Sequence, residues 1–429
     1  MKIIRAQEPQ FSDHLLRLLR RGETGQAQVE AEVRKILAEV RARKDAAVLE
    51  FCERFDGYRL LPSGIRVEPN EVRATYGTID PEVLSALRLA QERIADFHAR
   101  QKGRSWMVLE EGATLGQIER PLRRVGIYVP GGKASYPSSV LMNAIPAQVA
   151  GVEEIVMCTP AARDLSISPL VLIAADLVGI REIYRIGGAQ AIAALAYGTE
   201  SIPAVDKIVG PGNIYVAVAK RLVYGDVDID MVAGPSELLV YAEEDGDPAL
   251  IAADLLSQAE HDEMAYPLLI TPSETLAERV RMEIDLQAAR LSRSSIIEKC
   301  LQRNGCILIC RDRQEGIQLI NSIAPEHLEL MGENPWEMLG SIRNAGAVFL
   351  GASSPEVVGD YLAGPSHVLP TGGTARFSSP LGVEDFVKRS SVIFLSPERM
   401  EKLGEATVRL ARLEGLEAHA RAVEMRIKR

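Results

Sequence analysis

Glu182-Ile183-Tyr184-Arg185-Ile186-Gly187-Gly188-Ala189-Gln190 is the stretch that decides the fold. A short strand-like run ends in two glycines, and an apolar, helix-like run from Ala191 to Tyr197 follows at once. A strand that ends in a glycine turn and continues as a helix is typical of parallel α/β sheets. The stretch therefore predicts an α/β protein.

The same order of strand, glycine turn and helix recurs on both sides of this stretch. The run from Val125 to Val129 reaches Pro130-Gly131-Gly132, and the run from Lys207 to Val209 reaches Gly210-Pro211-Gly212-Asn213. Such turns present backbone N–H groups and helix N-termini to a ligand at the carboxyl edge of a sheet. Residues 128–234 are therefore a candidate nucleotide-binding unit. None of the turns is a G-x-G-x-x-G or a P-loop, and plain chain reversal remains the alternative.

A second α/β unit is expected after Ser236. Strand-like runs separated by helical patterns occupy residues 238–242, 268–271, 305–310 and 347–350. Cys306 and Cys310 flank one of these runs, and with Cys300 they lack a C-x-x-C pair. Core thiols are therefore predicted rather than a metal cluster or a disulfide framework.

Composition restricts the class of partner. The 429 residues are 47% hydrophobic and 25% charged, and the formal net charge is -10, with a pI near 5.4. Nucleic acid and anionic membranes both require a basic face, so a small molecule is the favoured partner. The first residues carry no apolar run of signal-peptide length, and Asp176 interrupts the longest apolar stretch. A cytoplasmic protein without a membrane span is expected.

One predicted helix, Asp247 to His261, ends in a pair of possible metal ligands. Asp247 followed by Pro248 is a helix start, and Gln258 and His261 are three residues apart, which puts them on one face. An amide oxygen and an imidazole nitrogen can bind a divalent ion when further ligands join them. A solvated helix end is the alternative.

Glu326 and His327 place a carboxylate beside an imidazole. Neighbours in a regular strand point to opposite faces, so both can serve one site only if the chain bends or the substrate passes between them. The alternative is a surface glutamate beside a structural histidine. Four of the six histidines gather near acidic residues or glycine turns in the last two fifths of the chain: His261, His327, His367 and His419.

These motifs together resemble the histidinol dehydrogenase family over essentially the full length. The matching stretches are Y-V-P-G-G at Tyr128, G-G-A-Q-A-I-A-A-L-A at Gly187, G-P-G-N at Gly210, A-G-P-S-E at Ala233, Q-A-E-H at Gln258, A-P-E-H-L at Ala324, G-D-Y at Gly359, G-P-S-H-V-L-P-T at Gly364 and E-G-L-x-A-H at Glu414. They occur in the order and spacing of that family.

The resemblance implies oxidation of L-histidinol through L-histidinal to L-histidine with two NAD molecules, the last steps of histidine biosynthesis, and one zinc per site. It implies the zinc ligands Gln258, His261, Asp360 and His419. It implies NAD contacts at Tyr128, Gln190 and Asn213. It implies substrate contacts at Ser236, His327, His367, Glu414 and the metal ligands, with Glu326 and His327 as the acid/base pair.

The resemblance also implies a domain organisation. Two incomplete Rossmann-like domains of the aldehyde-dehydrogenase-like type are expected with two small helical or extension domains. The expected boundaries are 1–24 for an N-terminal extension, 25–127 with 235–380 for the domain that carries the metal and acid/base residues, 128–234 for the NAD domain, and 381–429 for a C-terminal domain. That last domain reaches the partner subunit of a homodimer with shared active sites.

Two other functions are compatible with part of the pattern. A relative could oxidise another polar alcohol on the same zinc and NAD scaffold, although the joint presence of His327, His367 and Glu414 counts against it. A zinc hydrolase could use Glu326 to activate metal-bound water without a dinucleotide.

Overall fold

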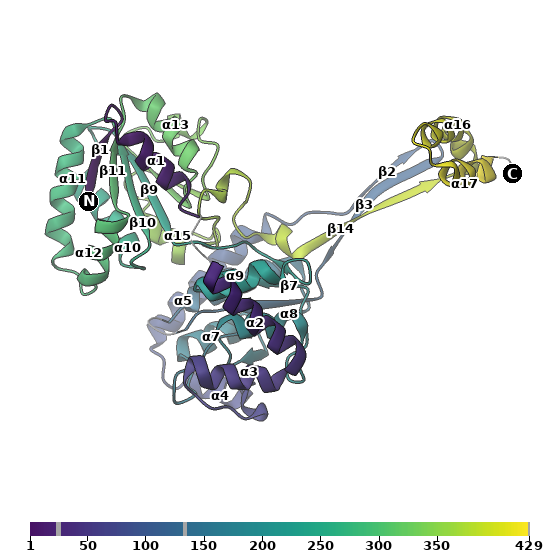
Figure 1. Cartoon of the computed structure of the whole chain (residues 1–429), viewed down its shortest axis with the longest axis horizontal. Helices are drawn as coiled ribbons and strands as arrows, with labels where there is room; N and C mark the ends of the chain where they lie inside the picture. Colours follow the sequence, from purple (N-terminus) through teal and green to yellow (C-terminus); the bar gives the residue numbers. More distant parts are fainter. Residues whose placement is uncertain (23–26, 132–134, 428–429) are drawn as a thin grey trace.

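The computed structural model describes residues 1–22, 27–131 and 135–427, so Gly132 of the first predicted glycine turn lies outside the described residues. Two units built on parallel sheets lie side by side, and a long arm projects from the second of them (Figure 1). The predicted α/β class with parallel sheets is confirmed.

The smaller sheet contains the stretch from which the fold was predicted. Its strands run parallel in the order β6-β5-β4-β7-β8, with bounds Glu182–Tyr184, Glu154–Cys158, Arg124–Tyr128, Lys207–Val209 and Asp228–Ile229. The chain leaves β4 in one direction for β5 and β6 and returns to its other side for β7 and β8. The carboxyl ends of β4 and β7 therefore form a topological switch point, where ligands bind in open α/β sheets.

Helices cover both faces of the smaller sheet. One face packs under α2, α3, α8 and α9, with bounds Ala27–Arg43, Asp45–Phe51, Gly188–Tyr197 and Ile214–Val223. The other face packs under α4, α5, α6 and α7, with bounds Pro69–Thr75, Pro81–Ala99, Pro137–Ala150 and Pro169–Leu177. A π-helical turn, Cys52–Asp56, and a 3₁₀ turn, Pro62–Gly64, connect α3 to α4.

This packing differs from the predicted boundaries. Residues 27–99 were expected with the metal-bearing unit, but the apolar face of α2, which includes Val33 and Val40, packs against α8 and α9 of the smaller unit. Val368 and Leu381 also join the core of the smaller unit. An amphipathic helix shows in its sequence which face is buried but not which sheet buries it, so the boundary prediction needs this correction.

The larger sheet is also parallel, in the order β1-β11-β10-β9-β12-β13. Its strands span Lys2–Arg5, Cys306–Ile309, Tyr266–Thr271, Glu237–Ala242, His327–Met331 and Ala347–Leu350. The edge strand β1 comes from the segment predicted as a separate extension, and Ile3 pairs with Ile307. The first residues are therefore part of this unit.

The helices of the larger unit also form two layers. The core on one face contains residues of α10, α11 and α12, and the core on the other face contains residues of α1, α13 and α14. These helices span Pro248–Ala259, Glu274–Ala288, Ser294–Arg303, Phe11–Leu19, Arg313–Ile323 and Trp336–Leu339. The short α15, Glu356–Tyr361, follows β13 and packs against α10. All five cysteines are buried and free, which confirms the prediction of core thiols.

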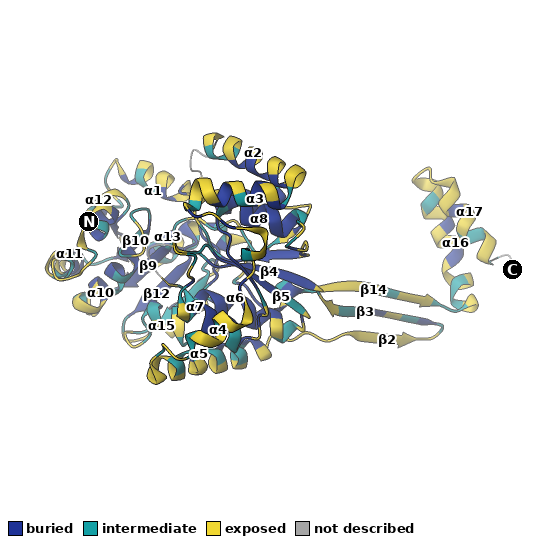
Figure 2. Ribbon diagram, turned by 90° about the horizontal axis from the view of Figure 1, so that it is seen from below, coloured by how far each residue is buried: buried dark blue, intermediate teal, exposed yellow. Residues whose placement is uncertain are grey.

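The arm is an antiparallel sheet in the order β14-β3-β2, which ends in α16 and α17 (Figure 1). The strands span Val387–Leu395, Ala113–Pro121 and Trp106–Glu110, and the helices span Pro397–Leu413 and Glu417–Ile427. Two 3₁₀ turns, Thr374–Arg376 and Val383–Phe386, precede β14. Exposed residues dominate the arm and its helices (Figure 2), and Leu109 and Leu413 expose 82% and 78% of their surface.

Among the described residues, no helix has both the length and the apolar character that a membrane crossing requires.

Candidate functional site

The residues that the resemblance predicts as the acid/base pair, Glu326 and His327, lie in the segment between α13 and the start of β12, which is called the acid/base turn below. Ala324 ends α13 with φ of 49° and ψ of 66°, a left-handed conformation that redirects the chain. Glu326 and His327 follow, and both are buried. Glu326 Oε2 lies 3.7 Å from His327 Nδ1, so the two adjacent side chains lie close together and not on opposite faces of a regular strand. The surface-residue alternative for this pair is therefore excluded.

Hydrogen bonds define the orientation of both side chains. The backbone N–H of Glu237 donates to Glu326 Oε2 at 2.8 Å. His327 Nδ1 lies 2.8 Å from the backbone carbonyl oxygen of Glu237. A carbonyl can only accept, so Nδ1 carries the proton and Nε2 keeps its lone pair. His327 Nε2 faces Glu356 Oε1 at 3.8 Å.

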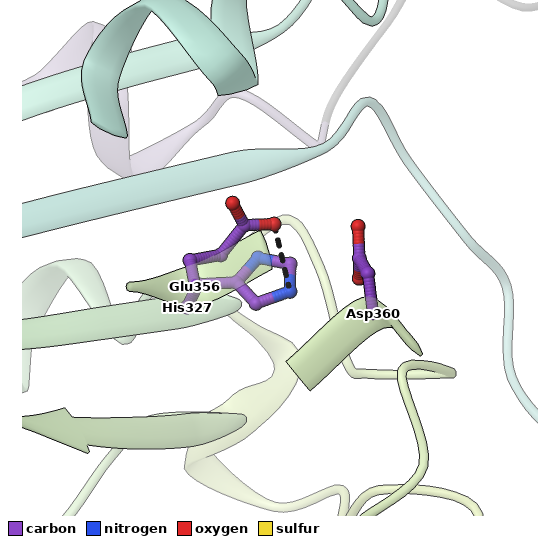
Figure 3. Close-up of side chains that lie close together, drawn as sticks. All are labelled: His327, Glu356 and Asp360. Carbon is purple, nitrogen blue, oxygen red and sulfur yellow. Dashed lines mark ion pairs between the residues drawn. The ribbon is translucent and has the colours of Figure 1, made fainter. Parts of the chain in front are cut away.

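His327, Glu356 and Asp360 form a compact group of possible metal ligands (Figure 3). One ligand atom of each lies within 4.8 Å of the others. Glu356 and Asp360 come from α15 and His327 from the start of β12. Only Asp360 belongs to the ligand set implied by the resemblance.

Gln258 supplies an independent sign of a ligand-binding site. It is 1% exposed at the end of α10, and its Oε1 has no hydrogen-bond partner among the described residues. A buried amide oxygen without a partner is costly unless a ligand binds to it. Ser257, its neighbour, donates to Glu356 Oε2 at 3.5 Å, which links α10 to α15. The donor set of amide, imidazole and carboxylate fits a zinc ion.

His261 lies just beyond the helix on which it was predicted. Asp247 caps α10 as expected by accepting from the Ala249 N–H, but α10 ends at Ala259 and His261 follows in a turn. Gln258 therefore lies in the last turn of the helix, and His261 lies in the turn directly after it, where its N–H donates to the Gln258 carbonyl oxygen at 3.3 Å. His261 is nevertheless electrostatically coupled to His327 and His367, since its charge lowers the pKa of both.

His367 approaches the same cluster from the loop after α15. Its Nδ1 lies 3.2 Å from the backbone oxygen of Asp360 and 3.7 Å from Asp360 Oδ1. Because the backbone oxygen accepts, Nδ1 donates and Nε2 is left as an acceptor. Ser236 directly precedes β9 and is partly buried.

Burial determines the protonation states of the cluster. Burial raises the pKa of Glu326 well above its usual range, and the charge of Glu237 acts in the same direction. Burial raises the pKa of Asp360 to about 6 and, with the charge of Asp360, that of Glu356 to about 8. Burial lowers the pKa of both His327 and His367 to about 4. Displaced pKa values in one buried group are typical of functional sites.

Glu414 and His419 are not part of this cluster within the chain. Glu414 ends α16 and His419 lies on α17, at the tip of the arm and far from α15 (Figure 1). Both side chains are exposed.

The three predicted NAD contacts line one pocket of about 1140 Å³. Tyr128 ends β4, Gln190 lies in the first turn of α8 and Asn213 caps α9, so the pocket lies at the switch point of the smaller sheet. The Gly188 N–H donates to Tyr128 Oη at 3.1 Å. Gln190 Nε2 donates to Asp56 Oδ2 at 3.2 Å. Helices α2 and α3 complete the walls.

Several residues of these sites were not predicted from the sequence. Asp56 of the pocket directly precedes Gly57 and was not predicted as a site residue. Glu356 and Arg21 were not singled out, and Glu237 was noted only as the last residue of the A-G-P-S-E motif. The pairing of Glu356 with Asp360 at i and i+4 on one helix was the one sequence pattern available.

The comparisons with known proteins agree with one another. A family model described as histidinol dehydrogenase matches residues 19–427. The histidinol dehydrogenase of Syntrophotalea carbinolica is 53% identical over 429 residues, which cover 100% of this chain and 99% of the relative. That of Geobacter metallireducens is 52% identical over 430 residues, which cover 100% and 98%. The crystal structure of histidinol dehydrogenase from Elizabethkingia anophelis has a TM-score of 0.94 at 36% identity and covers 100% of this chain and 98% of that one. The resemblance found in the motifs is confirmed, and the chain belongs to the histidinol dehydrogenase family.

Proposed function

We propose that this chain oxidises L-histidinol through L-histidinal to L-histidine, the last steps of histidine biosynthesis. The observation that supports this most is the acid/base turn, where the lone pair of His327 Nε2 and the carboxyl of Glu326 enter one buried cluster. Two oxidations at one carbon require a proton acceptor for the alcohol and an activated water for the aldehyde. The cluster offers one residue for each task.

His327 takes the hydroxyl proton of the alcohol. Its low pKa keeps the imidazole neutral near pH 7, and the bond from Nδ1 to the Glu237 oxygen orients Nε2 toward the substrate side. The ring can therefore accept a proton at Nε2 without rearranging.

Glu326 activates the water that attacks the aldehyde. One carboxyl oxygen accepts from the Glu237 N–H, which leaves Oε1 for the water. A raised pKa makes the carboxylate a stronger base, so proton transfer from water is more favourable.

Gln258, His261 and Asp360 hold the metal, together with His419 from a second copy of the chain. A bound zinc ion supplies a fixed charge that orients the imidazole and amine of the substrate. His367 also fixes the position of Asp360, because its Nδ1–H donates to the backbone oxygen of Asp360. His367 Nε2 and the Ser236 hydroxyl supply further polar contacts to the substrate, and Glu414 of the second copy supplies a carboxylate for its amine.

NAD binds in the pocket at the switch point of the smaller sheet. The dinucleotide supplies the hydride acceptor for each oxidation. Tyr128, Gln190 and Asn213 line the pocket, and glycine backbone at Gly131 and Gly188 leaves room for close approach. The side chain of Asn213 also caps α9 by accepting from the N–H groups of Tyr215 and Val216, so its contact to NAD uses the free amide N–H₂.

Two copies assemble so that each arm completes the other's site. The arm holds Glu414 and His419 far from the cluster of its own chain (Figure 1) and exposes apolar side chains, among them Leu109, Phe394 and Leu413. Exposed apolar surface of this extent is typical of an interface.

The test of the proposed reaction is the absorbance of reduced nicotinamide on mixing zinc-loaded protein, NAD and L-histidinol. Two equivalents of reduced NAD per histidinol are expected, with histidine as the product. Turnover of another polar alcohol in preference to histidinol, or hydrolysis without NAD reduction, would favour the alternative functions instead.

A chelator is expected to abolish the activity, because Gln258, Asp360 and the histidines cannot orient the substrate alone. Added zinc should restore it, and manganese or cobalt should substitute in part, since all the proposed ligands offer nitrogen or oxygen. Metal content and activity are measured on the same samples. Full activity in verified metal-free protein would contradict the metal assignment.

Gly210→Ala is expected to raise the KM for NAD more than tenfold. Gly210 has φ of 113°, and a Cβ there would lie 2.1 Å from the Tyr128 carbonyl oxygen, so the turn must shift at the pocket. Gly225→Ala is the matched control, because Gly225 has φ of 106° with nothing within 4 Å. The control carries the backbone strain alone, and an equal rise in its KM would show that the close approach to Tyr128 is irrelevant.

A further inference from the structure

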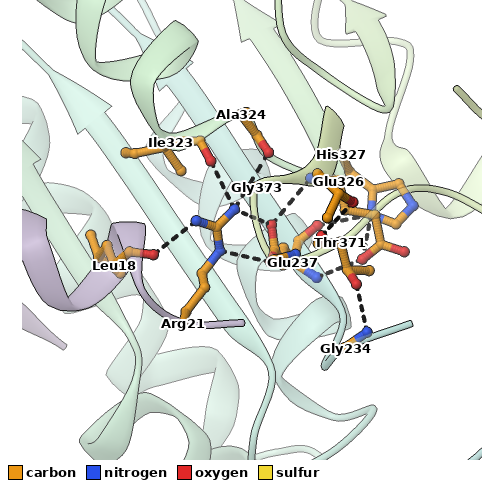
Figure 4. A network of polar contacts seen from close by, with 12 residues as sticks. Leu18, Arg21, Gly234, Glu237, Ile323, Ala324, Glu326, His327, Thr371 and Gly373 are labelled. Carbon is orange, nitrogen blue, oxygen red and sulfur yellow. Dashed lines mark hydrogen bonds and ion pairs between the residues drawn. The ribbon is translucent and has the colours of Figure 1, made fainter. Parts of the chain in front are cut away.

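Arg21 and Glu237 form a buried ion pair behind the acid/base turn (Figure 4). Their side chains are 1% and 2% exposed. Arg21 donates through Nε to Oε1 at 2.7 Å and through Nη2 to Oε2 at 2.6 Å, which is the two-pronged geometry that only arginine provides. Arg21 lies just after α1, about 300 residues before the turn in the sequence.

Glu237 contacts both acid/base residues. Its N–H donates to Glu326 Oε2 and its carboxylate accepts from the Glu326 N–H at 3.3 Å. Its carbonyl oxygen accepts from His327 Nδ1. Its carboxylate also accepts from the Gly372 N–H at 2.7 Å, which ties the neighbouring loop to the same point.

Arg21 also reaches the turn directly. Nη2 donates to the carbonyl oxygens of Ile323 at 2.9 Å and Ala324 at 3.4 Å, and Nη1 donates to the Leu18 oxygen at 2.8 Å. Ala324 is one of the few non-glycine residues with positive φ among the described residues. An alanine in this conformation is strained and persists only where its surroundings hold it. The guanidinium is one of the groups that hold it.

We infer that Arg21 and Glu237 are positioning residues for the reaction, which hold the turn at Ala324 so that Glu326 and His327 face the same substrate. The inference rests on the proposed roles of Glu326 and His327. Two buried charges are costly to desolvate, and an apolar pair of similar size would often stabilise a core as well. We assign Arg21 and Glu237 a positioning role because their hydrogen bonds go to the acid/base turn itself.

The test uses Arg21→Lys in the full-length, zinc-loaded protein. Lysine keeps the charge next to Glu237 but cannot bond both carboxylate oxygens and the two carbonyls together. We expect kcat for histidinal oxidation to fall at least about tenfold, because small displacements of reacting groups have large effects on rate. The KM values for histidinol and NAD and the zinc content should stay within twofold of wild type.

Arg124→Lys is the matched control. Arg124 is also buried and pairs with two carboxylates, those of Glu154 and Glu182, but at the amino end of β4, away from both sites. The Arg124→Lys variant should keep the kcat of wild type. Rates are expressed per zinc-loaded, folded subunit, and thermal unfolding is measured for each variant. If Arg21→Lys does not fold, the same rates are measured in Glu237→Gln.

The outcomes separate three cases. A lower kcat at unchanged KM in Arg21→Lys or Glu237→Gln, absent from Arg124→Lys, supports the inference. A kcat per folded subunit equal to that of the control overturns it. Glu326→Gln is measured in the same experiment. If Glu326→Gln loses histidinal oxidation while Arg21→Lys and Glu237→Gln keep it, only the positioning inference fails. If Glu326→Gln keeps histidinal oxidation, the proposed role of Glu326 fails and the positioning inference fails with it.

Discussion

An equal mixture of His261→Asn and His419→Asn subunits is expected to regain roughly a quarter of wild-type activity per subunit, although each variant alone is inactive. Each proposed site takes Gln258, His261 and Asp360 from one chain and His419 from the other. A mixed dimer therefore has one site with both lesions and one site with neither. Random reassortment makes about half of the dimers mixed, and half of their sites are intact.

The double variant His261→Asn with His419→Asn gives the complementary control. Mixed with an equal amount of wild-type subunits, it should leave roughly a quarter of the wild-type activity per subunit, because every mixed dimer then carries one lesion in each site. Sites built within one chain would leave half. Activity is read after subunit exchange has been verified by mass spectrometry on differently tagged chains. A mixture of the single variants that stays inactive would show that His419 acts within its own chain.

Glu326→Gln is expected to slow the oxidation of histidinal about a hundredfold or more, the usual contribution of a general base, and to slow the oxidation of histidinol less. Only the aldehyde step requires an activated water. The glutamine can still accept from the Glu237 N–H, so the turn should keep its shape. Single-turnover absorbance traces started from histidinol and from histidinal separate the two steps.

His327→Asn is expected to slow the oxidation of histidinol more than the oxidation of histidinal, because the alcohol step requires the proton acceptor. Zinc content and thermal unfolding of both variants show whether the site is otherwise intact. An equal loss of both steps in Glu326→Gln would mean that this carboxyl does something other than activate water.

The strands and the glycine turns were predictable because their signals are local. β-branched runs that end in glycine, as at Gly187 and Gly210, predict both an element and its end. The assignment of α2 to a unit was not predictable, because its apolar face fits either sheet. The pairing of β1 with β11 joins residues about 300 apart, and no local pattern records it.

Site residues were predictable where they lie within one short sequence motif. Glu326 and His327 were found as neighbours, but the orientation of both side chains depends on hydrogen bonds to the backbone of Glu237, about 90 residues earlier in the chain. Arg21 and Glu237 were missed for the same reason that β1 was misplaced, since their roles arise only when distant segments meet. The position of His419 far from its own cluster likewise follows from the arm as a whole.

The edge position of β1 has a consequence for the order in which the chain can mature during translation. Lys2–Arg5 leave the ribosome first, but their partner strand, Cys306–Ile309, is made about 300 residues later. At the usual 5–20 residues per second the interval is about 15–60 s, during which most of the smaller unit is synthesised, although Val368 and Leu381 of its core come later. The ion pair of Arg21 with Glu237 must wait nearly as long. The N-terminal segment therefore docks late on the larger sheet, and the acid/base turn is among the last parts of the nascent chain to take its final shape.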